Sequence, residues 1–439
     1  MLDFVAAKNA FDSGDAGGLT RILAAGCDSQ DSFANFTGAF VRLALHGQAV
    51  DARLPDDLKV YVDTMEETRR RLAGAVSVPR PHRVISHQHG FVADTGGVSS
   101  WKPIQVLNRL VMDQLVPRKK LAVVGTMRND GIYLLEWVAH YLALGFEHVF
   151  CYTNDNADGS DELLAALARH GVVTIIQNEL SPLIPPESKA FGHAMNLLHE
   201  LREYEWALFV DSDEFLELPA HTGHKMSSVL DAIDNADPDK RIAAVLYDWL
   251  WYVSEFAFEK TPGILLERFS HAREHWLGKC LVRTKNVYSM RQQHHAELPP
   301  GYVHVDSALT PIDQATIWDR RAPNYAGGRL NHYWPRSFQE FAIKKARGAT
   351  LNFKQNFYDR PYTTFFSWNG YESADAFYPA DNGLIAAVKT KIAELRTVPE
   401  IVECDDRIQA NFPKFLAGIS SDEMLRTIYR QNRAEPGPL

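Results

Sequence analysis

Residues 206–214 read Trp-Ala-Leu-Phe-Val-Asp-Ser-Asp-Glu, five apolar residues followed directly by an acidic cluster. A short apolar run of this kind is typical of a strand buried on both faces of a sheet. In extended backbone, residues i and i+2 point to the same side, so the carboxylates of Asp211 and Asp213 should lie together. Two such carboxylates repel each other unless a cation lies between them, and Mg²⁺ or Mn²⁺ bound in this way usually also binds substrate phosphates. The stretch therefore predicts a metal site for a diphosphate.

Strands and helices alternate along the chain before this stretch. The predicted segments are, in order, a strand at 120–125, a helix at 131–144, a strand at 148–152, a helix at 161–170, a strand at 172–176 and a helix at 190–204. This alternation indicates an α/β fold, with a mostly parallel sheet flanked by helices. Polar clusters follow three of the strands, at 126–130, 154–158 and 211–214. Because ligands of such sheets bind at the carboxyl ends of the strands, the clusters predict one shared binding site.

The second half of the chain is less regular. Its predicted elements are a strand at 241–252, a strand pair at 276–287, and helices at 337–348 and 384–395. The spacing of Lys344 and Arg347 places both on one face of the helix predicted at 337–348. They either cradle a diphosphate or form a solvated basic helix end, and Lys279 and Arg283 are weaker candidates for the same task.

The composition is that of a globular protein. The 439 residues are 46% hydrophobic and 23% charged, and the net charge of −9 argues against a protein that binds the nucleic-acid backbone. Four scattered cysteines without a CxxC spacing indicate reduced, buried thiols. Neither a secretory signal nor an uncharged apolar stretch of membrane-spanning length is found, which predicts a cytoplasmic protein without a transmembrane segment. Homo-oligomers and peripheral membrane association remain open.

Four blocks of sequence resemble one known family in the same order. They are residues 127–146, 154–160, 206–216 and 331–348, and they resemble the glycosyl transferase family 2-like group close to glycosyltransferase family 92. The resemblance covers about residues 119–350. It implies a GT-A fold, a nucleotide-sugar donor and a divalent metal.

The resemblance also implies roles for individual residues. Those placed at the nucleotide base and ribose, or on the second loop of that pocket, are Thr126, Arg128, Asp130, Asp155 and Asp158. The implied metal ligands are Asp211, Asp213 and His332. Two departures leave the donor open: the first block more often reads Lys-Asn-Glu where this chain has Arg-Asn-Asp at 128–130, and residues 189–193 are atypical.

The sequence as a whole is thus read as a metal-dependent glycosyltransferase of three parts. A mainly helical region with a linker is expected at 1–118, a GT-A domain at 119–358 and a mainly helical extension at 359–439. The expected cofactor is Mn²⁺ or Mg²⁺, the favoured donor is a UDP-sugar, and the acceptor is a glycan or another hydroxyl. The rival functions are a metal-dependent phosphoryl or nucleotidyl transferase and a non-catalytic glycan-binding protein of the same fold.

The resemblance favours inversion of the anomeric centre, which needs a general base for the acceptor hydroxyl. Glu297, Glu274 and Asp306 are the candidates, and Glu297 is preferred for its place beside His294 and His295. These two histidines compete with His332 as ligands, whereas His82, His87 and His89 are read as exposed loop histidines. Trp249, Trp251, Trp276 and Trp334 either stack on sugar rings or, as is commoner, pack in the core.

Overall fold

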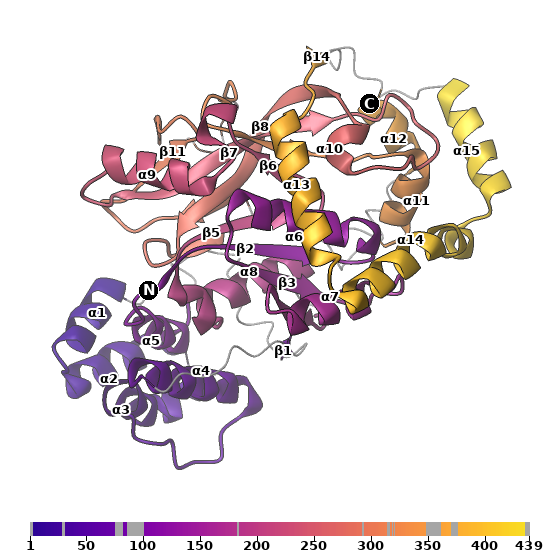
Figure 1. Cartoon of the computed structure of the whole chain (residues 1–439). Coiled ribbons are helices and arrows are strands. Elements are labelled where there is room, and N and C mark those ends of the chain that lie inside the picture. The colour runs from indigo at the N-terminus through magenta and orange to yellow at the C-terminus, as the bar shows by residue number, and fades with distance from the viewer. Residues whose placement is uncertain are drawn as a thin grey trace.

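The computed structural model shows an α/β protein with a mixed sheet and helices at both ends of the chain (Figure 1). It describes residues 3–28, 31–74, 82–85, 101–181, 184–291, 294–313, 317, 319, 321–347, 361–369 and 376–434. Within these ranges, one sheet has twelve strands and runs β1-β4-β3-β2-β5-β8-β7-β11-β12, with β6, β13 and β14 off this path. The α/β fold with helical extensions at both ends is confirmed.

The parallel half of the sheet holds the strands predicted from apolar runs. It consists of β1 (His82–Ile85), β4 (Val173–Asn178), β3 (His148–Thr153), β2 (Lys119–Met127) and β5 (Tyr204–Asp211). The connecting helices are α6 (Gly131–Leu144), α7 (Ser160–Arg169) and α8 (Pro186–Asn196). Separate hydrophobic clusters cover the two faces, one with α6 and α7 and the other with α8. Burial on both faces explains why these strands are apolar throughout.

The helix before β5 differs from its prediction at 190–204. It begins at Pro186, which takes the first helical position where its missing N–H costs nothing, and it ends at Asn196. A separate 3-10 turn, η4 (His199–Glu203), then leads into β5. The two segments were merged in the prediction because both carry apolar residues at helical spacing.

The other half of the sheet contains both antiparallel and parallel pairs, and it brings distant parts of the chain to the acidic turn. It contains β6 (Glu214–Glu217), β7 (Ile242–Tyr252), β8 (His271–Arg283), β11 (Val303–Asp306), β12 (Pro311–Ile312), β13 (Arg329–His332) and β14 (Ala376–Phe377). The strand pair predicted at 276–287 is wrong, because β8 is one long strand between β5 and β7. The strand β13 pairs with β6 so that His332 lies opposite Glu214. A small hairpin of β9 (Ser289–Arg291) and β10 (His295–Glu297) lies off this sheet.

Helices at the two ends of the chain pack on different sides of the sheet (Figure 1). The N-terminal set has its own hydrophobic cluster and comprises α1 (Phe4–Asp12), α2 (Ala16–Ala25), α3 (Thr37–His46), α4 (Asp56–Leu72) and α5 (Pro103–Met112). The C-terminal set is α13 (Asn382–Leu395), α14 (Pro399–Ile419) and α15 (Asp422–Ala434). The remaining helices are α9 (Met226–Ala236), α10 (Leu265–Arg268), α11 (Phe338–Ala346) and α12 (Thr363–Asn369). The predicted domain boundaries stay predictions, and the one at 358/359 falls outside the described residues.

Two predictions from composition can be compared with the structure. All four cysteines are free thiols, and three of them are buried, whereas Cys27 is half-buried. No helix within the described ranges is long and apolar enough to cross a membrane.

Glu136 on α6 gives a testable link between pH and stability. Its carboxylate accepts a hydrogen bond from the Leu265 backbone N–H at 2.8 Å, and burial raises the pKa of Glu136 from 4.5 to about 7. A carboxyl group whose pKa is raised in the folded state stabilises the fold at pH values below its pKa in the unfolded chain. This contribution to stability is lost as the pH rises toward 7. We expect Glu136→Gln, which keeps an acceptor oxygen, to stabilise the protein by up to about 3 kcal/mol at pH 8. Urea unfolding should show little effect near pH 4, and an equal gain at both pH values would contradict the expectation.

Candidate active site

The acidic turn lies where β5 ends and β6 begins, and its backbone is fixed from three sides. The Asp211 N–H donates to Glu214 Oε2 at 2.9 Å, and Trp137 Nε1 of α6 donates to the Asp211 carbonyl oxygen at 3.1 Å. The Tyr333 N–H, just after β13, donates to the Asp213 carbonyl oxygen at 2.9 Å. The turn is therefore held by elements from before and after it in sequence, so the two aspartates have little freedom to move.

Lys279 of β8 forms an ion pair with the first aspartate of the turn, Asp211. Its Nζ lies 3.0 Å from Asp211 Oδ2 and 3.3 Å from Glu187 Oε1, and the side chain is buried. Glu214 Oε1 is 3.9 Å from the same ammonium. Despite the opposing effect of burial, Asp211 and its neighbours raise the pKa of Lys279, while burial and Asp211 raise the pKa of Glu187 to about 7. One ammonium thus faces three carboxylates.

Gly278 allows β8 to bring Lys279 to this position. A Cβ at Gly278 would lie 1.9 Å from the Tyr247 carbonyl oxygen of β7, which no side chain can tolerate. The strand register shifts close by, between Asp248 and Leu250. A glycine is therefore required where β8 crosses this irregularity.

The second aspartate has different partners. Asp213 forms an ion pair with Lys344 of α11, and its Oδ1 lies 3.5 Å from His332 Nε2. Burial lowers the pKa of His332 although Asp213 opposes the shift, which favours the neutral imidazole that can bind a metal. The Nδ1 atom of His332 is buried and has no hydrogen-bond partner among the described residues.

The side chains around the turn include oxygen and nitrogen donors of the kind that bind a divalent cation. Four carboxyl groups and two ammonium groups meet at the turn, and burial raises the pKa of two of these carboxyl groups, Glu187 and Glu214. Asp213 and His332 approach each other as ligands of one cation would, whereas Asp211 is held by Lys279 and by Thr126 Oγ1 at 3.4 Å. No three His, Cys, Asp or Glu side chains are already gathered around a metal position in the described part of the chain. The donor set suits a divalent cation held by Asp213 and His332.

Asp130 is the centre of a second buried charge cluster. It accepts a hydrogen bond from Ser212 Oγ at 2.7 Å and from Arg336 Nη1 at 3.2 Å, and it pairs with Arg347. Although burial opposes it, Arg347 and Arg336 lower the pKa of Asp130. The guanidinium of Arg336 also lies 3.7 Å from the ring centroid of Tyr133. Asp130 therefore fixes the acidic turn to α11, and its predicted contact with the nucleotide stays a prediction.

The first two polar loops are bonded to each other. Asn129, at φ +52°, accepts from the Ala157 N–H at 2.7 Å, and its own N–H donates to Asn156 Oδ1 at 2.8 Å. Asp158 accepts from the Gly131 N–H at 2.7 Å, while Asp155 is exposed. The clusters at 126–130 and 154–158 thus form one surface, as the parallel sheet predicts.

The end of α11 joins this surface. Arg128 Nη1 donates to the Arg347 carbonyl oxygen at 3.0 Å, and Arg347 Nη1 donates to the Arg128 carbonyl oxygen at 2.9 Å. Ser337 and Glu340 form a capping box, bonding reciprocally at the start of the helix. Lys344 is buried on Asp213, so it is not part of a solvated helix end.

Other predicted residues lie elsewhere or in structural contacts. Arg283 pairs with Glu205 and Asp234 near the amino end of β5, away from the acidic turn along the strand. Glu297 on β10 accepts from Ser289 Oγ at 3.1 Å, and its role as general base stays a prediction. The loop prediction for His87 and His89 lies outside the described residues, as does the side chain of His82.

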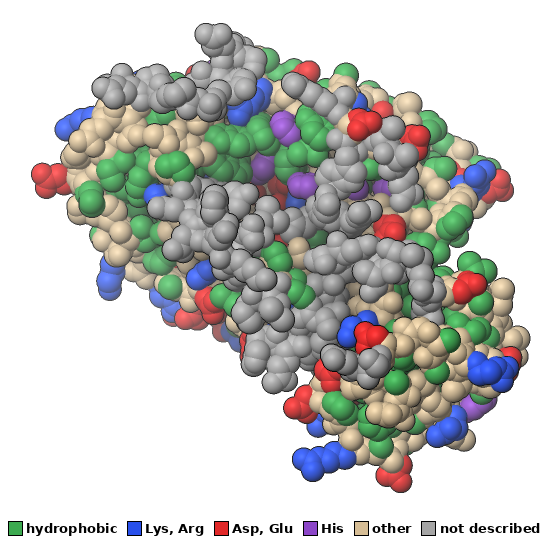
Figure 2. Space-filling view, turned by 180° about the vertical axis from the view of Figure 1, so that it is seen from behind, with side chains coloured by type: hydrophobic (Ala, Val, Ile, Leu, Met, Phe, Trp, Pro, Cys, Tyr) green, Lys and Arg blue, Asp and Glu red, His purple; other side chains and the backbone are tan. Residues whose placement is uncertain are grey.

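Of the two adjacent histidine candidates, His294 and His295, His294 lies closer to the acidic turn. Its Nδ1 is 3.0 Å from the Gly278 carbonyl oxygen, next to Lys279, and burial lowers its pKa to about 3. His295 and His304 are buried, and His304 Nε2 lies 2.9 Å from the Ala296 carbonyl oxygen. Figure 2 shows one face of the molecule on which histidine and hydrophobic side chains gather.

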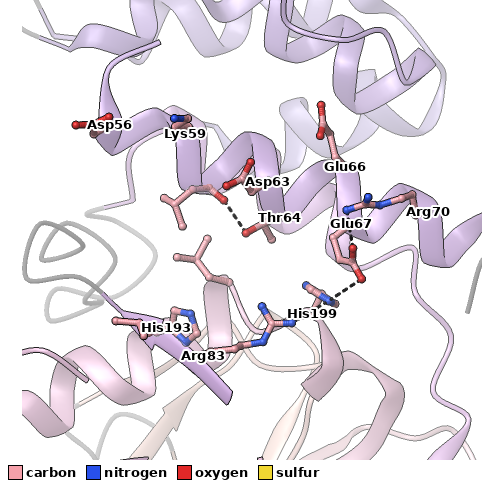
Figure 3. A pocket seen from close by; sticks show the side chains of 13 residues that line it. Asp56, Lys59, Asp63, Thr64, Glu66, Glu67, Arg70, Arg83, His193 and His199 are labelled. Atoms are coloured by element: carbon pink, nitrogen blue, oxygen red, sulfur yellow. Dashed lines mark hydrogen bonds and ion pairs between the residues drawn. The ribbon is translucent and has the colours of Figure 1, made fainter. Parts of the chain in front are cut away.

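A hollow lies between the N-terminal helix α4 and the sheet. It has a volume of about 610 Å³ and lies between α4, β1 and α8, where Asp63 and Glu67 face Arg83 and His193 (Figure 3). Below it, Glu200 pairs with Arg83 and lies 3.3 Å from His199 Nε2. None of the predicted site residues lines this cavity.

Comparison with known proteins adds evidence from sequence. The profile of glycosyltransferase family 92 matches residues 127–359, just over half of the chain. A glycosyltransferase family 92 protein of Oryza sativa subsp. japonica is 29% identical over 103 residues, which are 23% of this chain and 17% of that protein. One of Arabidopsis thaliana is 28% identical over 111 residues, 25% of this chain and 19% of that protein. The matches thus span less than a fifth of these relatives.

The chain also aligns with solved structures. The structure of S. aureus TarS, residues 1–349, aligns over 72% of this chain and 88% of that one, with 12% identity and a TM-score of 0.27. The fold assignment rests on the sheet topology described above and takes nothing from this likeness.

Proposed function

The chain belongs to glycosyltransferase family 92, and from this premise we propose that it transfers a sugar from a nucleotide-diphosphate donor to a hydroxyl acceptor. The proposal includes a divalent cation, Mn²⁺ or Mg²⁺, and a UDP-sugar as the favoured donor. The observation that supports it best is the acidic turn, where Asp211 and Asp213 lie at the carboxyl edge of the sheet with a buried lysine on each. Diphosphates bind where fixed positive groups and a cation meet at such an edge.

Residues at the acidic turn would bind different parts of the donor and its cation. Asp213 and His332 would hold the cation, and the bound cation would neutralise the charge that develops on the departing diphosphate. Lys279 and Lys344 keep the two carboxylates ionised and oriented, and either ammonium can donate to a phosphate oxygen. The joined loops at 126–130 and 154–158 lie beside them as the surface for the nucleoside.

The test is a thermal-shift titration with UDP-, GDP-, dTDP- and CMP-sugars, each with and without Mn²⁺. We expect one diphosphate class to stabilise the protein, by about 2.7 kcal/mol at a hundredfold excess over its Kd, and Mn²⁺ to strengthen the effect. CMP-sugars carry a single phosphate and serve as the matched control. Release of nucleoside diphosphate indicates sugar transfer, because a phosphoryl or nucleotidyl transferase would cleave the diphosphate linkage and release nucleoside monophosphate or sugar phosphate instead. Failure of every diphosphate sugar to stabilise the protein or to be turned over would overturn the proposal.

A further inference from the structure

Two of the three carboxylates predicted as general bases have other contacts or positions. Asp306 accepts hydrogen bonds at 2.9 Å from the N–H groups of Ala308 and Thr310, and these bonds close the turn after β11. Glu274 is exposed on β8 and lies four residues before Gly278, a separation of about 13 Å along an extended strand. Asp306 is thus used by the turn that it closes, and Glu274 lies away from the acidic turn along the strand.

The third candidate, Glu297, lies where the β9–β10 hairpin meets the N-terminal helices. It is paired with Ser289 in the hairpin, and its carboxylate accepts a hydrogen bond from Ser289 Oγ at 3.1 Å. Tyr288, directly before Ser289, packs on Phe4 and Trp101, with ring centroids 5.3 and 6.1 Å away. Both of these aromatic residues belong to the N-terminal hydrophobic cluster. This end of the hairpin therefore lies on the N-terminal side of the molecule.

The contact of His294 with β8 decides which ring nitrogen can take a proton. Its Nδ1 lies 3.0 Å from the Gly278 carbonyl oxygen, and a carbonyl oxygen can only accept a hydrogen bond. Nδ1 therefore carries the hydrogen, and the lone pair of the neutral imidazole is on Nε2. Burial, and then Lys279, lower the pKa of His294 to about 3. The ring is thus neutral at physiological pH and comparable as a base to an aspartate, whose ordinary pKa is about 3.9.

His294 borders the acidic turn through two neighbours. The carbonyl group that it contacts directly precedes Lys279, whose Nζ lies 3.0 Å from Asp211 Oδ2. Its other neighbour is Trp249, whose ring centroid is 5.0 Å from that of His294 and 4.7 Å from that of His332. The His294 side chain is half-buried, so part of it is exposed to solvent. The imidazole therefore lies at the border of the site that the proposed function assigns to the donor.

We propose that His294 is the general base that takes the proton of the acceptor hydroxyl in an inverting transfer. This inference rests on the proposed function and assigns one residue of its mechanism. The acceptor oxygen forms a bond to the anomeric carbon while its proton passes to Nε2. The bond from that carbon to the diphosphate oxygen breaks, and its electron pair leaves with the nucleoside diphosphate. The Gly278 carbonyl oxygen stabilises the imidazolium that forms, and water then takes up the proton.

The first experiment compares two nucleophiles in the whole protein. Water must lose a proton when it attacks the anomeric carbon, whereas azide carries no proton and needs no base. We expect His294→Gln to lower the release of nucleoside diphosphate with water by about 10²–10⁴-fold, and to change formation of the glycosyl azide by less than about threefold. The substrates are the UDP-, GDP- and dTDP-sugars of the donor titration, with Mn²⁺. Loss of both reactions in a variant that still binds donor, or loss of neither, would overturn the assignment.

Further variants test the rival assignments. His271→Gln is the matched control, because His271 is a half-buried histidine at the other end of β8, and it should keep both reactions. Selective loss of the water reaction in Glu297→Gln would identify Glu297 as the base and overturn the proposal. The Mn²⁺ concentration that gives half-maximal azide turnover should be the same in His294→Gln as in the unaltered protein. A clear increase would show that His294 binds the cation, which would also overturn the proposal.

A measurement on the unaltered protein covers the case in which His294→Gln does not fold. Diethyl pyrocarbonate acylates neutral imidazoles, and mass spectrometry of peptides locates the modified histidines. We expect the water reaction to be lost in step with modification of His294, while the azide reaction remains. Full water turnover after His294 is modified, or a His294 that does not react at all, would overturn the proposal. A protein that binds and turns over diphosphate sugars keeps the proposed function even if this assignment fails, so the two levels are distinguished.

Discussion

Replacing Asp213 by asparagine should lower sugar transfer by about 10²–10³-fold, the loss seen when a group that stabilises transition-state charge is removed. The structure adds a second expected effect. Lys344 is buried on Asp213 and would lose this ion pair while it stays buried. We therefore expect Asp213→Asn also to lower the free energy of unfolding by about 3 kcal/mol. Donor turnover and urea unfolding measure the two effects separately.

The matched control is the double variant Asp213→Asn with Lys344→Met. It removes both charges of the buried pair, so stability should return to near that of the unaltered protein while activity stays low. This outcome would show that the catalytic loss does not result from partial unfolding. Recovery of activity together with stability would show that Asp213 acts only as a structural partner of Lys344.

Replacing Glu340 by alanine should cost about 3–5 kcal/mol of stability, because Arg268 would be left as a buried charge. Glu340 is fully buried, and its oxygens lie 2.8 and 2.6 Å from the two terminal nitrogens of Arg268. It also accepts from Tyr133 Oη at 2.5 Å and from the Ser337 N–H at 2.9 Å. Glu340 also belongs to the capping box at the start of α11, the helix that carries Lys344. A loss of donor binding should therefore accompany the loss of stability.

Two controls separate the parts of this network. Ser337→Ala removes the helix cap and the hydroxyl hydrogen bond to Glu340 but leaves the Arg268 pair intact, and it should cost about 1 kcal/mol. The Arg268 pair lowers the pKa of Glu340 to about 2 despite burial, so its contribution is present above pH 4.5 and is lost as the pH falls toward 2. The difference in free energy of unfolding between Glu340→Ala and the unaltered protein should therefore become smaller in acid. A difference in free energy of unfolding that stays constant from pH 7 to pH 2.5 would contradict the ion-pair explanation.

Local patterns predicted the parallel half of the fold well. The strands at 120–125, 148–152, 172–176 and 206–210 were visible because burial on both faces makes each one apolar throughout. The strand β8 was not, because its length depends on pairing with β5 on one side and β7 on the other. Such long-range pairing leaves no mark on the spacing of the strand itself.

The site shows the same division. Asp211 and Asp213 could be found from the sequence because strand, turn and acid cluster are contiguous, and Lys344 because it shares a helix face with Arg347. Glu187, Ser212 and Arg336 were missed as charge or hydrogen-bond partners. Only the folded chain brings these residues together, so no local signal could identify them.

The contacts made by α11 have a consequence for how the protein acquires its activity. Lys344 and Asp213 are 131 residues apart, and Arg347 and Asp130 are 217 apart. Contacts of such long range form late, since the chain between them must first be ordered. On a ribosome, the parallel half of the sheet can therefore assemble before α11 has been synthesised. Until that helix arrives, the nascent chain has its architecture but an incomplete donor site.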